Sequence, residues 1–190
     1  MTLIANIRAC TQCAHPLPLV PKPILQFSAT APILVAGQAP GIRAHNYGQA
    51  FRDPSGERLR DWLGVNEQTF YDSRHFAIVP MGFCYPGTGK SGDLAPLAHC
   101  AQAWRDQVMQ ALSNTKLTLI LGQYAMRYHT GSRYKTVTEA VKDWQANWPE
   151  QLVLPHPSPR NNRWLKRNPW FEQDVLPRLK ERVAELLNEN

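Results

Sequence analysis

Short apolar runs alternate with amphipathic stretches along most of this chain. The runs Ile33–Ala36 and Leu117–Leu121 each stop at a glycine, and such runs are typical of strands buried on both faces of a parallel sheet. Shorter runs at residues 76–79 and Gln151–Leu154 predict two further strands. The pattern therefore predicts four buried strands.

Between these runs, apolar residues recur at helical spacing. They predict a helix over residues 55–63 with Ser55 as its N-cap, a long helix through residues 97–112, a helix from about Gln123, and an amphipathic helix over residues 171–186. Strands that alternate with helices in this way predict a three-layer α/β/α sandwich with a central, mainly parallel four-stranded sheet.

Three segments follow predicted strands at their carboxyl ends, where sites form in such sheets: residues 37–41, 80–89 and 155–162. The first reads Gly-Gln-Ala-Pro-Gly, and its glycines would let a ligand approach the backbone amides. The chain has neither the G-x-G-x-x-G fingerprint nor a G-x-x-x-x-G-K-[ST] loop, which excludes the usual dinucleotide and nucleoside triphosphate motifs.

The last of these segments is stiffened by prolines that alternate with His156 and Ser158. An imidazole held in this way can donate a hydrogen bond to developing negative charge. A basic run that contains Trp164 and no acidic residue follows this segment. Basic residues interleaved with an aromatic are what a loop needs in order to track phosphates or probe a duplex. The cations of the run are Arg160, Arg163, Lys166 and Arg167.

Length and composition indicate one domain over residues 1–190, since 190 residues at 43% hydrophobic can bury a full core. Residues 1–32 are expected to form an N-terminal arm, Pro-rich and extended from residue 15 onward. The net charge of +6 favours a polyanionic partner. No apolar stretch is long enough for a membrane span and no cleavage site is visible, so we expect a cytoplasmic monomer.

Four cysteines, Cys10, Cys13, Cys84 and Cys100, are the only ones in the chain. Without a secretory signal, two such pairs indicate a metal site more readily than two disulfides, because a Cys-x-x-Cys turn and a distant pair can complete a four-sulfur shell. The shell would pin the arm onto the core. The alternative is four unrelated buried thiols.

In combination these motifs resemble the uracil-DNA glycosylase superfamily. Residues 37–41 resemble its first motif and His156-Pro157-Ser158 its second. The cysteine spacing resembles the iron–sulfur branches, families four and five, and implies a [4Fe–4S] cluster, with Zn²⁺ as the alternative. The resemblance covers residues 10 to about 170.

Enzymes that act on a base take it out of the stack and read its edge and face. By resemblance, a backbone segment would line the base site, Phe51 would stack on the base, and His156 would hydrogen-bond uracil O2, with Ser158 beside it in the motif. The segment that lines the base site comprises Gly37, Ala39, Pro40 and Gly41. The residues that would contact DNA are Arg160, Asn161, Asn162, Arg163, Lys166 and Arg167.

The chain departs from the family pattern in two places. Gln38 and Ala39 stand where related enzymes carry a carboxylate or Asn that activates water. Asp53 is the closest substitute, in a stretch that resembles Phe-x-Gly-Asp-x-Ser-Gly of family five but is one residue shorter; Gln38 and His45 are other candidates. Asp53 as a turn residue at a helix N-terminus is the alternative. The Asn that commonly pairs with the uracil edge falls near Pro80.

The resemblance implies a DNA glycosylase that hydrolyses the N-glycosidic bond of uracil or another deaminated base. No lysine suits a Schiff base, so a monofunctional enzyme is expected. The main alternative is a non-catalytic binder of damaged or single-stranded DNA, of which a binder trapped covalently through His156 is a variant. A small-molecule enzyme with a doubly wound fold is a third interpretation.

Overall fold

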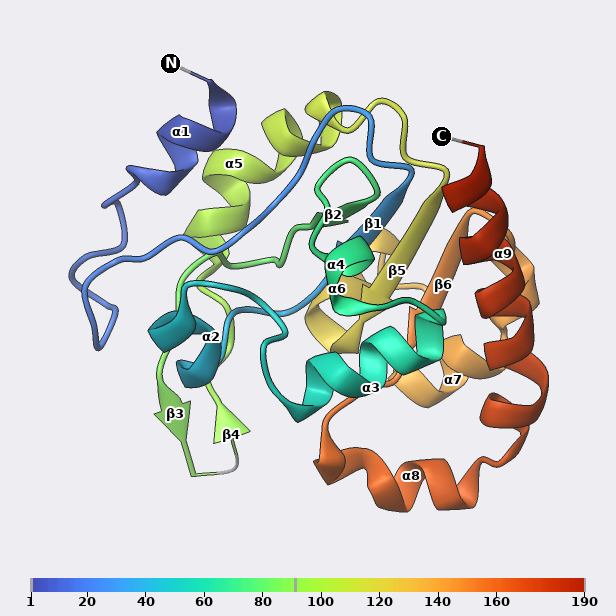
Figure 1. The fold of residues 1–190 in the computed structure, drawn as a ribbon. Coiled ribbons are helices and arrows are strands. Elements are labelled where there is room, and N and C mark those ends of the chain that lie inside the picture. The colour runs from blue at the N-terminus through green and yellow to red at the C-terminus, as the bar shows by residue number, and fades with distance from the viewer. Residues whose placement is uncertain (1, 91, 190) are drawn as a thin grey trace.

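The computed structural model describes residues 2–90 and 92–189 and is built around a parallel sheet (Figure 1). Its strands run in the order β2-β1-β5-β6. In register, Ile33 lies opposite both Phe76 and Leu117, and Thr118 lies opposite Gln151. The predicted four-stranded parallel sheet is confirmed. The strands are β1 (Ile33–Ala36), β2 (Phe76–Ile78), β5 (Leu117–Leu121) and β6 (Gln151–Leu154).

Helices flank this sheet in the predicted three-layer arrangement, with α3 and α9 packed on each other and α6 and α7 packed on β5 and β6 (Figure 1). A π-helical segment, Phe171–Val175, leads into α9, so the predicted C-terminal helix is present but begins irregularly. The helices are α1 (Leu3–Arg8), α2 (Ile42–Tyr47), α3 (Pro54–Leu63), α4 (Glu67–Phe70), α5 (Ala98–Ala111), α6 (Gly122–His129), α7 (Val137–Lys142), α8 (Asn162–Arg167) and α9 (Leu176–Asn188).

The start of α3 differs from the prediction. Asp53, not Ser55, is the N-cap, and its Oδ1 accepts a 2.9 Å hydrogen bond from the Gly56 amide. Pro54 explains the shift, because its fixed φ favours the first helical position and moves the cap to the residue before it. The prediction of Ser55 as the N-cap was therefore wrong. One carboxylate oxygen of Asp53 is engaged in capping α3.

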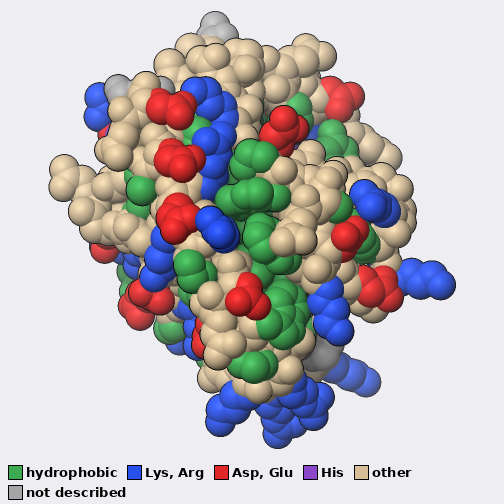
Figure 2. All heavy atoms as spheres, turned by 90° about the vertical axis from the view of Figure 1, so that its right-hand side faces the viewer, with side chains coloured by type: hydrophobic (Ala, Val, Ile, Leu, Met, Phe, Trp, Pro, Cys, Tyr) green, Lys and Arg blue, Asp and Glu red, His purple; other side chains and the backbone are tan. Residues whose placement is uncertain are grey.

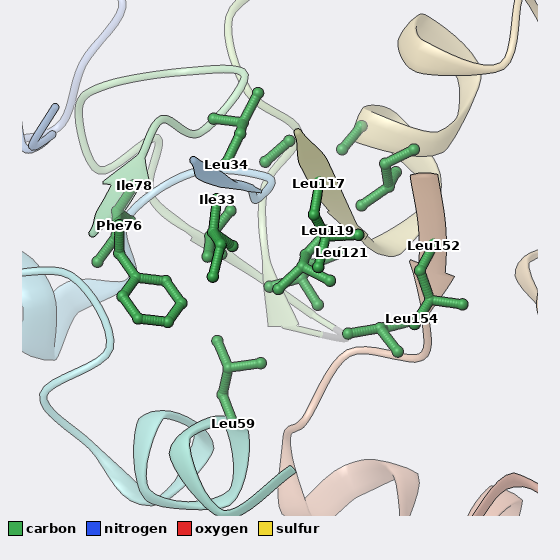
Figure 3. Packing of buried hydrophobic residues seen from close by; sticks show 14 of the residues in the cluster. Ile33, Leu34, Leu59, Phe76, Ile78, Leu117, Leu119, Leu121, Leu152 and Leu154 are labelled. Carbon is green, nitrogen blue, oxygen red and sulfur yellow. The ribbon is translucent and has the colours of Figure 1, made fainter. Parts of the chain in front are cut away.

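The core lies between the sheet and its helices (Figure 3). Leu59 of α3 reaches toward strand residues such as Ile33 and Phe76, and all three are fully buried. The N-terminal arm joins this core through Ile7 and Leu25, and it contains the short helix α1, which was not predicted. None of the described helices is long and apolar enough to cross a membrane.

A short hairpin, β3 (Thr88–Gly89) and β4 (Gly92–Asp93), follows β2 along the chain and precedes α5, and it projects below α2 in Figure 1. Its strands are too short to produce a hydrophobic pattern, and two of their four residues are glycines, so the hairpin could not be predicted from periodicity. Its position matters because β4 ends close to the segment that follows β1.

Candidate active site

The segment that follows β1 is fastened to the segment that follows β2. Met81 N–H donates to Gly37 O at 2.9 Å, and Gly82 N–H donates to Gln38 O at 3.0 Å. A Cβ atom on Gly37 would lie 3.7 Å from Phe51 Cζ and 3.9 Å from Pro80 Cβ. The Phe51 ring and Pro80 therefore cover the side of Gly37 that lacks a side chain, so residues 14 to 44 positions apart in the sequence meet at the carboxyl end of the sheet.

Phe51 is held in an unusual backbone conformation with φ of 57°. Its carbonyl oxygen accepts a 3.3 Å hydrogen bond from Arg60 Nη1 and fits against Gly56, where any side chain would overlap it. Its ring packs edge-on against Phe70, with centroids 6.2 Å apart. A bulky residue with positive φ is strained, and such strain is found preferentially at functional sites.

His156 is fixed through its backbone and one ring nitrogen. Ser158 N–H donates to His156 Nδ1 at 3.2 Å, and Asn161 Nδ2 donates to the His156 carbonyl at 2.7 Å. Arg58 of α3 holds the same loop through the carbonyls of Pro157 and Ser158. Because a backbone N–H can only donate, Nδ1 is the acceptor, and the proton of the neutral ring is on Nε2.

The charge state of His156 follows from its surroundings. Burial lowers the pKa of His156, the nearby carboxylates of Asp53 and Asp93 oppose that shift, and Arg160 adds to it. The ring is therefore neutral at pH 7. Among residues 2–90 and 92–189, no hydrogen-bond partner occupies Nε2, so its N–H remains available as a donor.

Asp93, a residue with no predicted site role, ends the hairpin beside the first motif. Its Oδ1 accepts a 3.2 Å hydrogen bond from Thr88 Oγ1, and the Thr88 hydroxyl lies 2.6 Å from Tyr85 Oη. A Cβ atom on Gly41 would lie 3.0 Å from Asp93 Oδ2. Gln38 Nε2 donates to Leu94 O at 3.3 Å and holds the hairpin there. In the sequence Asp93 is a single carboxylate between Gly92 and Leu94, which by itself gives no sign of a site role.

His45, the other predicted candidate for the water, lies on α2 beside Tyr85, with ring centroids 6.2 Å apart. Its Nδ1 is buried without a hydrogen-bond partner in the described part of the chain. Burial and the nearby Lys22 ammonium lower the pKa of His45. Lys22 Nζ also donates to the His45 carbonyl at 2.7 Å, which holds the end of α2.

The basic run continues from the His156 loop into α8. Arg160 Nη1 reaches over Gly92 and so links this loop to the hairpin. The side chains of Arg163, Lys166 and Arg167 are exposed, and none forms an ion pair with a described residue. Figure 2 shows Lys and Arg side chains gathered at the lower end of the molecule, the level at which α8 lies in Figure 1.

Trp164 does not belong to this basic surface, contrary to the prediction. Its Nε1 donates to Thr138 Oγ1 at 2.8 Å, and its ring packs edge-on against Phe171 with centroids 5.6 Å apart. The indole is therefore a packing residue that anchors α8 on the body. The spacing of the run could not distinguish this inward position from an outward one.

The four cysteines line one pocket between the arm, the segment after β2 and the start of α5. All four thiols are free. Burial, together with the neighbouring cysteines, raises the pKa of Cys84 to about 11 and of Cys100 to about 12, although backbone hydrogen bonds oppose both shifts. Within the described residues, no three His, Cys, Asp or Glu side chains are close enough together to hold a single metal ion.

The same pocket contains an unpaired donor. Trp104 lines it, and Trp104 Nε1 is buried without an acceptor in the described part of the chain. His99 Nε2 lies 3.1 Å from Gln12 Oε1, a contact that joins α5 to the Cys-x-x-Cys turn. The four thiols thus share one enclosure, and the common metal site remains a prediction.

Residues 25–180 match the protein-family model described as the uracil DNA glycosylase superfamily. The match includes all four strands, His156 and the second cysteine pair, and it begins after the first pair.

Proposed function

Because the chain belongs to the uracil DNA glycosylase superfamily, we propose that it hydrolyses the N-glycosidic bond of uracil or another deaminated base in DNA. The observation that carries the proposal is the hydrogen bond at His156 Nδ1, which assigns the ring proton to Nε2. Ser158 N–H occupies Nδ1, which leaves an Nε2–H donor at the carboxyl end of the sheet. A fixed, neutral donor suits a reaction in which negative charge develops on the leaving base.

In this mechanism the base leaves the stack and its face lies against Phe51. The C1′–N bond breaks, and its electron pair departs with the base. His156 Nε2–H donates to the base oxygen on which the charge gathers, while the oxygen of a water molecule bonds to C1′. The proton released by the water finally neutralises the base anion. Removing one such donor typically lowers a rate by about 10²–10³-fold.

Pro80 limits how the base edge can be read. It has no side-chain donor or acceptor, and its carbonyl already accepts a 3.2 Å hydrogen bond from Arg105 Nη1. Discrimination by hydrogen bonding requires groups that would be left unpaired by the wrong base. We therefore propose a substrate range of deaminated bases that is wider than uracil alone.

The basic run would supply the DNA contacts. Arg163, Lys166 and Arg167 are exposed on α8, on the chain directly after the His156 loop. Cations in this position can neutralise phosphates on either side of an extruded nucleotide. Arg160 reaches across to the hairpin and acts on the charge of His156.

We also propose that the four cysteines hold a [4Fe–4S] cluster. Thiols that share an enclosure and have raised pKa values need a cationic group to become thiolates, and the unpaired Trp104 Nε1–H would find an acceptor in a cluster sulfur. A single Zn²⁺ held by all four sulfurs at about 2.3 Å is the alternative occupant. When bound, the cluster would anchor the arm.

The cluster proposal predicts visible absorbance and about four irons per chain in anaerobically purified protein. Cys84→Ala should lose both and melt at a lower temperature. Cys84→Ala protein with unchanged iron content, or wild-type protein that contains zinc and no iron, would contradict the proposal.

The proposed activity is tested on duplexes that contain one uracil, hypoxanthine or xanthine, with enzyme in excess of DNA. Free base should appear together with an abasic site, and the strand should stay intact until alkali is added. Unmodified duplex of the same sequence is the control. Release of none of the three bases over hours would overturn the proposal.

A non-catalytic binder of damaged DNA is the second candidate, because the first motif has Gln38 and Ala39 where a carboxylate is usual. Tight, lesion-dependent binding without base release would favour it. A protein–DNA adduct that resists denaturation would instead indicate covalent capture by His156.

A further inference from the structure

Two carboxylates approach His156 closely enough to act on its charge, Asp53 and Asp93. They come from different parts of the chain and are held in different ways. Oδ1 of Asp53 is engaged as the N-cap of α3. This cap stabilises the helix whether or not the residue takes part in chemistry, so its position has a sufficient structural explanation.

Asp93 has no comparable helix to cap. It pairs with Thr88 across the hairpin, and the Thr88 hydroxyl holds Oδ1 at 3.2 Å. Behind Thr88, the buried Tyr85 fixes that hydroxyl through a 2.6 Å hydrogen bond. The chain Tyr85–Thr88–Asp93 therefore orients Oδ1, whereas Oδ2 has no hydrogen-bond partner among the described residues.

The other oxygen, Oδ2, is directed at the first motif. A Cβ atom on Gly41 would lie only 3.0 Å from it, closer than ordinary van der Waals contact. Gly41 has φ of −77° and ψ of 174°, a conformation open to any residue. Its lack of a side chain therefore has a spatial effect, because it leaves room for the Asp93 carboxylate beside the motif.

The hairpin that carries Asp93 is tied to both predicted motifs. Gln38 of the first motif donates to Leu94 O, directly after Asp93. Arg160, four residues after His156, reaches over Gly92, directly before Asp93. The carboxylate is thus held between the two motifs although it belongs to neither, and it is solvent-exposed where a substrate could reach it.

We infer that Asp93 is the catalytic carboxylate that binds and orients the attacking water, in place of the carboxylate that the first motif lacks. This inference rests on the proposed function. Asp93 Oδ2 accepts a hydrogen bond from the water, whose oxygen bonds to C1′ as the C1′–N pair leaves with the base. The water proton passes to Asp93 and then to solvent, and solvent protonates the base anion. The anionic carboxylate also stabilises positive charge on the sugar.

The test compares Asp93→Asn with Asp53→Asn in single-turnover base release, using whichever duplex of the panel the wild type cleaves. Asn caps a helix about as well as Asp, so Asp53→Asn keeps α3 and serves as the matched control. We expect a 10²–10³-fold slower rate for Asp93→Asn, unchanged DNA affinity, and less than a tenfold change for Asp53→Asn.

Two further variants separate chemistry from structure. Asp93→Gly should be inactive but regain part of its rate in added formate, whereas chloride at the same ionic strength should not restore it. Gly41→Ala, which places a methyl group against Oδ2, should slow base release although Asp93 is retained. If Asp93→Asn melts at a lower temperature, formate rescue of Asp93→Gly still decides the role.

The outcomes distinguish the inference from the function on which it rests. A wild type that releases base, together with an Asp93→Asn variant of equal rate, would overturn the inference alone. A slow Asp53→Asn beside a fast Asp93→Asn would assign the water to Asp53. A wild type that releases no base from any duplex would overturn both.

Discussion

Two histidines stand near arginines in this molecule, and the fold uses them differently. His129 accepts a hydrogen bond from Arg105 Nη2, with 2.6 Å between the nitrogens, and Arg105 is only 1% exposed. His156 lies near Arg160, and no described residue is bonded to its Nε2. In the first pair the His129 acceptor and both terminal nitrogens of Arg105 are hydrogen-bonded, and only the buried Arg105 Nε lacks a partner in the described part of the chain, whereas the second pair keeps the Nε2 donor of His156 free. Local bonding, more than residue type, separates a supporting pair from a reactive one.

The Arg105–His129 pair supports the backbone of the site that contains His156. Arg105 Nη1 donates to Val79 O at 2.9 Å and to Pro80 O at 3.2 Å, at the point where β2 ends and Pro80 meets Gly37. The Tyr128 ring covers the guanidinium at 5.3 Å. Arg105 thereby holds the backbone on which Pro80 and Phe51 rest, without facing the substrate. Substitutions at Arg105 or His129 should therefore lower stability, whereas substitutions at His156 should lower the rate of base release.

The largest effect is expected from His156→Asn. The Asn oxygen can take the place of Nδ1 and accept from Ser158 N–H, but the side chain is too short to reach the position of Nε2. Base release should fall by about 10²–10³-fold, while the melting temperature stays within a few degrees. Single-turnover assays and thermal unfolding measure the two quantities. A large loss of stability with little loss of rate would make His156 a structural residue like His129.

Arg105→Met should give the opposite profile. It leaves the carbonyls of Val79 and Pro80 and the His129 ring without their donor in a buried place. Unpaired buried acceptors cost about 1–3 kcal/mol each, and partial relaxation reduces the total, so we expect about 2–4 kcal/mol less free energy of unfolding. Urea denaturation measures it. Arg105→Lys keeps the charge but has fewer donors, so its free energy of unfolding should lie between those of the wild type and Arg105→Met. An Arg105→Met variant as stable as the wild type would show that the Arg105–His129 pair does not contribute to stability.

The pH dependence of the free energy of unfolding tests the structural role of His129 separately from the proposed catalytic role of His156. Burial and the Arg105 charge lower the pKa of His129 to about 3, whereas an unfolded histidine titrates near 6.5. The unfolded chain therefore binds the proton first, so this contribution to stability is complete above pH 6.5 and is lost as the pH falls toward 3. Between pH 6.5 and 5 the loss is at most about 2 kcal/mol.

His129→Gln is the variant that isolates this contribution, because its amide oxygen can accept from Arg105 without titrating. Unfolding in urea at pH 7 and pH 5 should show a smaller difference for the variant than for the wild type. His156 has a lowered pKa as well and remains in both proteins, so the subtraction isolates His129. Equal pH dependence in the two proteins would refute the assignment.

The strands were predictable because each is a short apolar run, and burial on both faces of a parallel sheet requires such runs. The register, the helix α1 and the hairpin were not, since none depends on periodicity. Asp53 shows the limit clearly. From the sequence, Asp53 could be either a helix cap or a catalytic carboxylate. The structure shows that it caps α3.

The candidate site was predictable only where a motif was contiguous. Residues 37–41 and His156 belong to such motifs, and Phe51 was found by resemblance. Asp93 and Arg105 were not found, because their importance arises from contacts between segments distant in sequence: Asp93 with Gly41, and Arg105 with Val79 and His129. Trp164 was misjudged because the sequence does not state which way a short helix faces.

The smallest effect is expected for DNA affinity, from the exposed cations of α8 that follow Arg160 and His156 along the chain. Arg163→Gln removes one exposed cation of α8 that has no ion-pair partner among the described residues. If this cation contacts a phosphate, DNA affinity should fall a few-fold at moderate salt, and the slope of log K against log salt should decrease by about 1. Arg178→Gln is the matched control, because Arg178 is exposed on α9 and paired with Glu181 at 3.5 Å. Equal slopes for both variants and the wild type would remove α8 from the DNA interface while leaving the role of His156 intact.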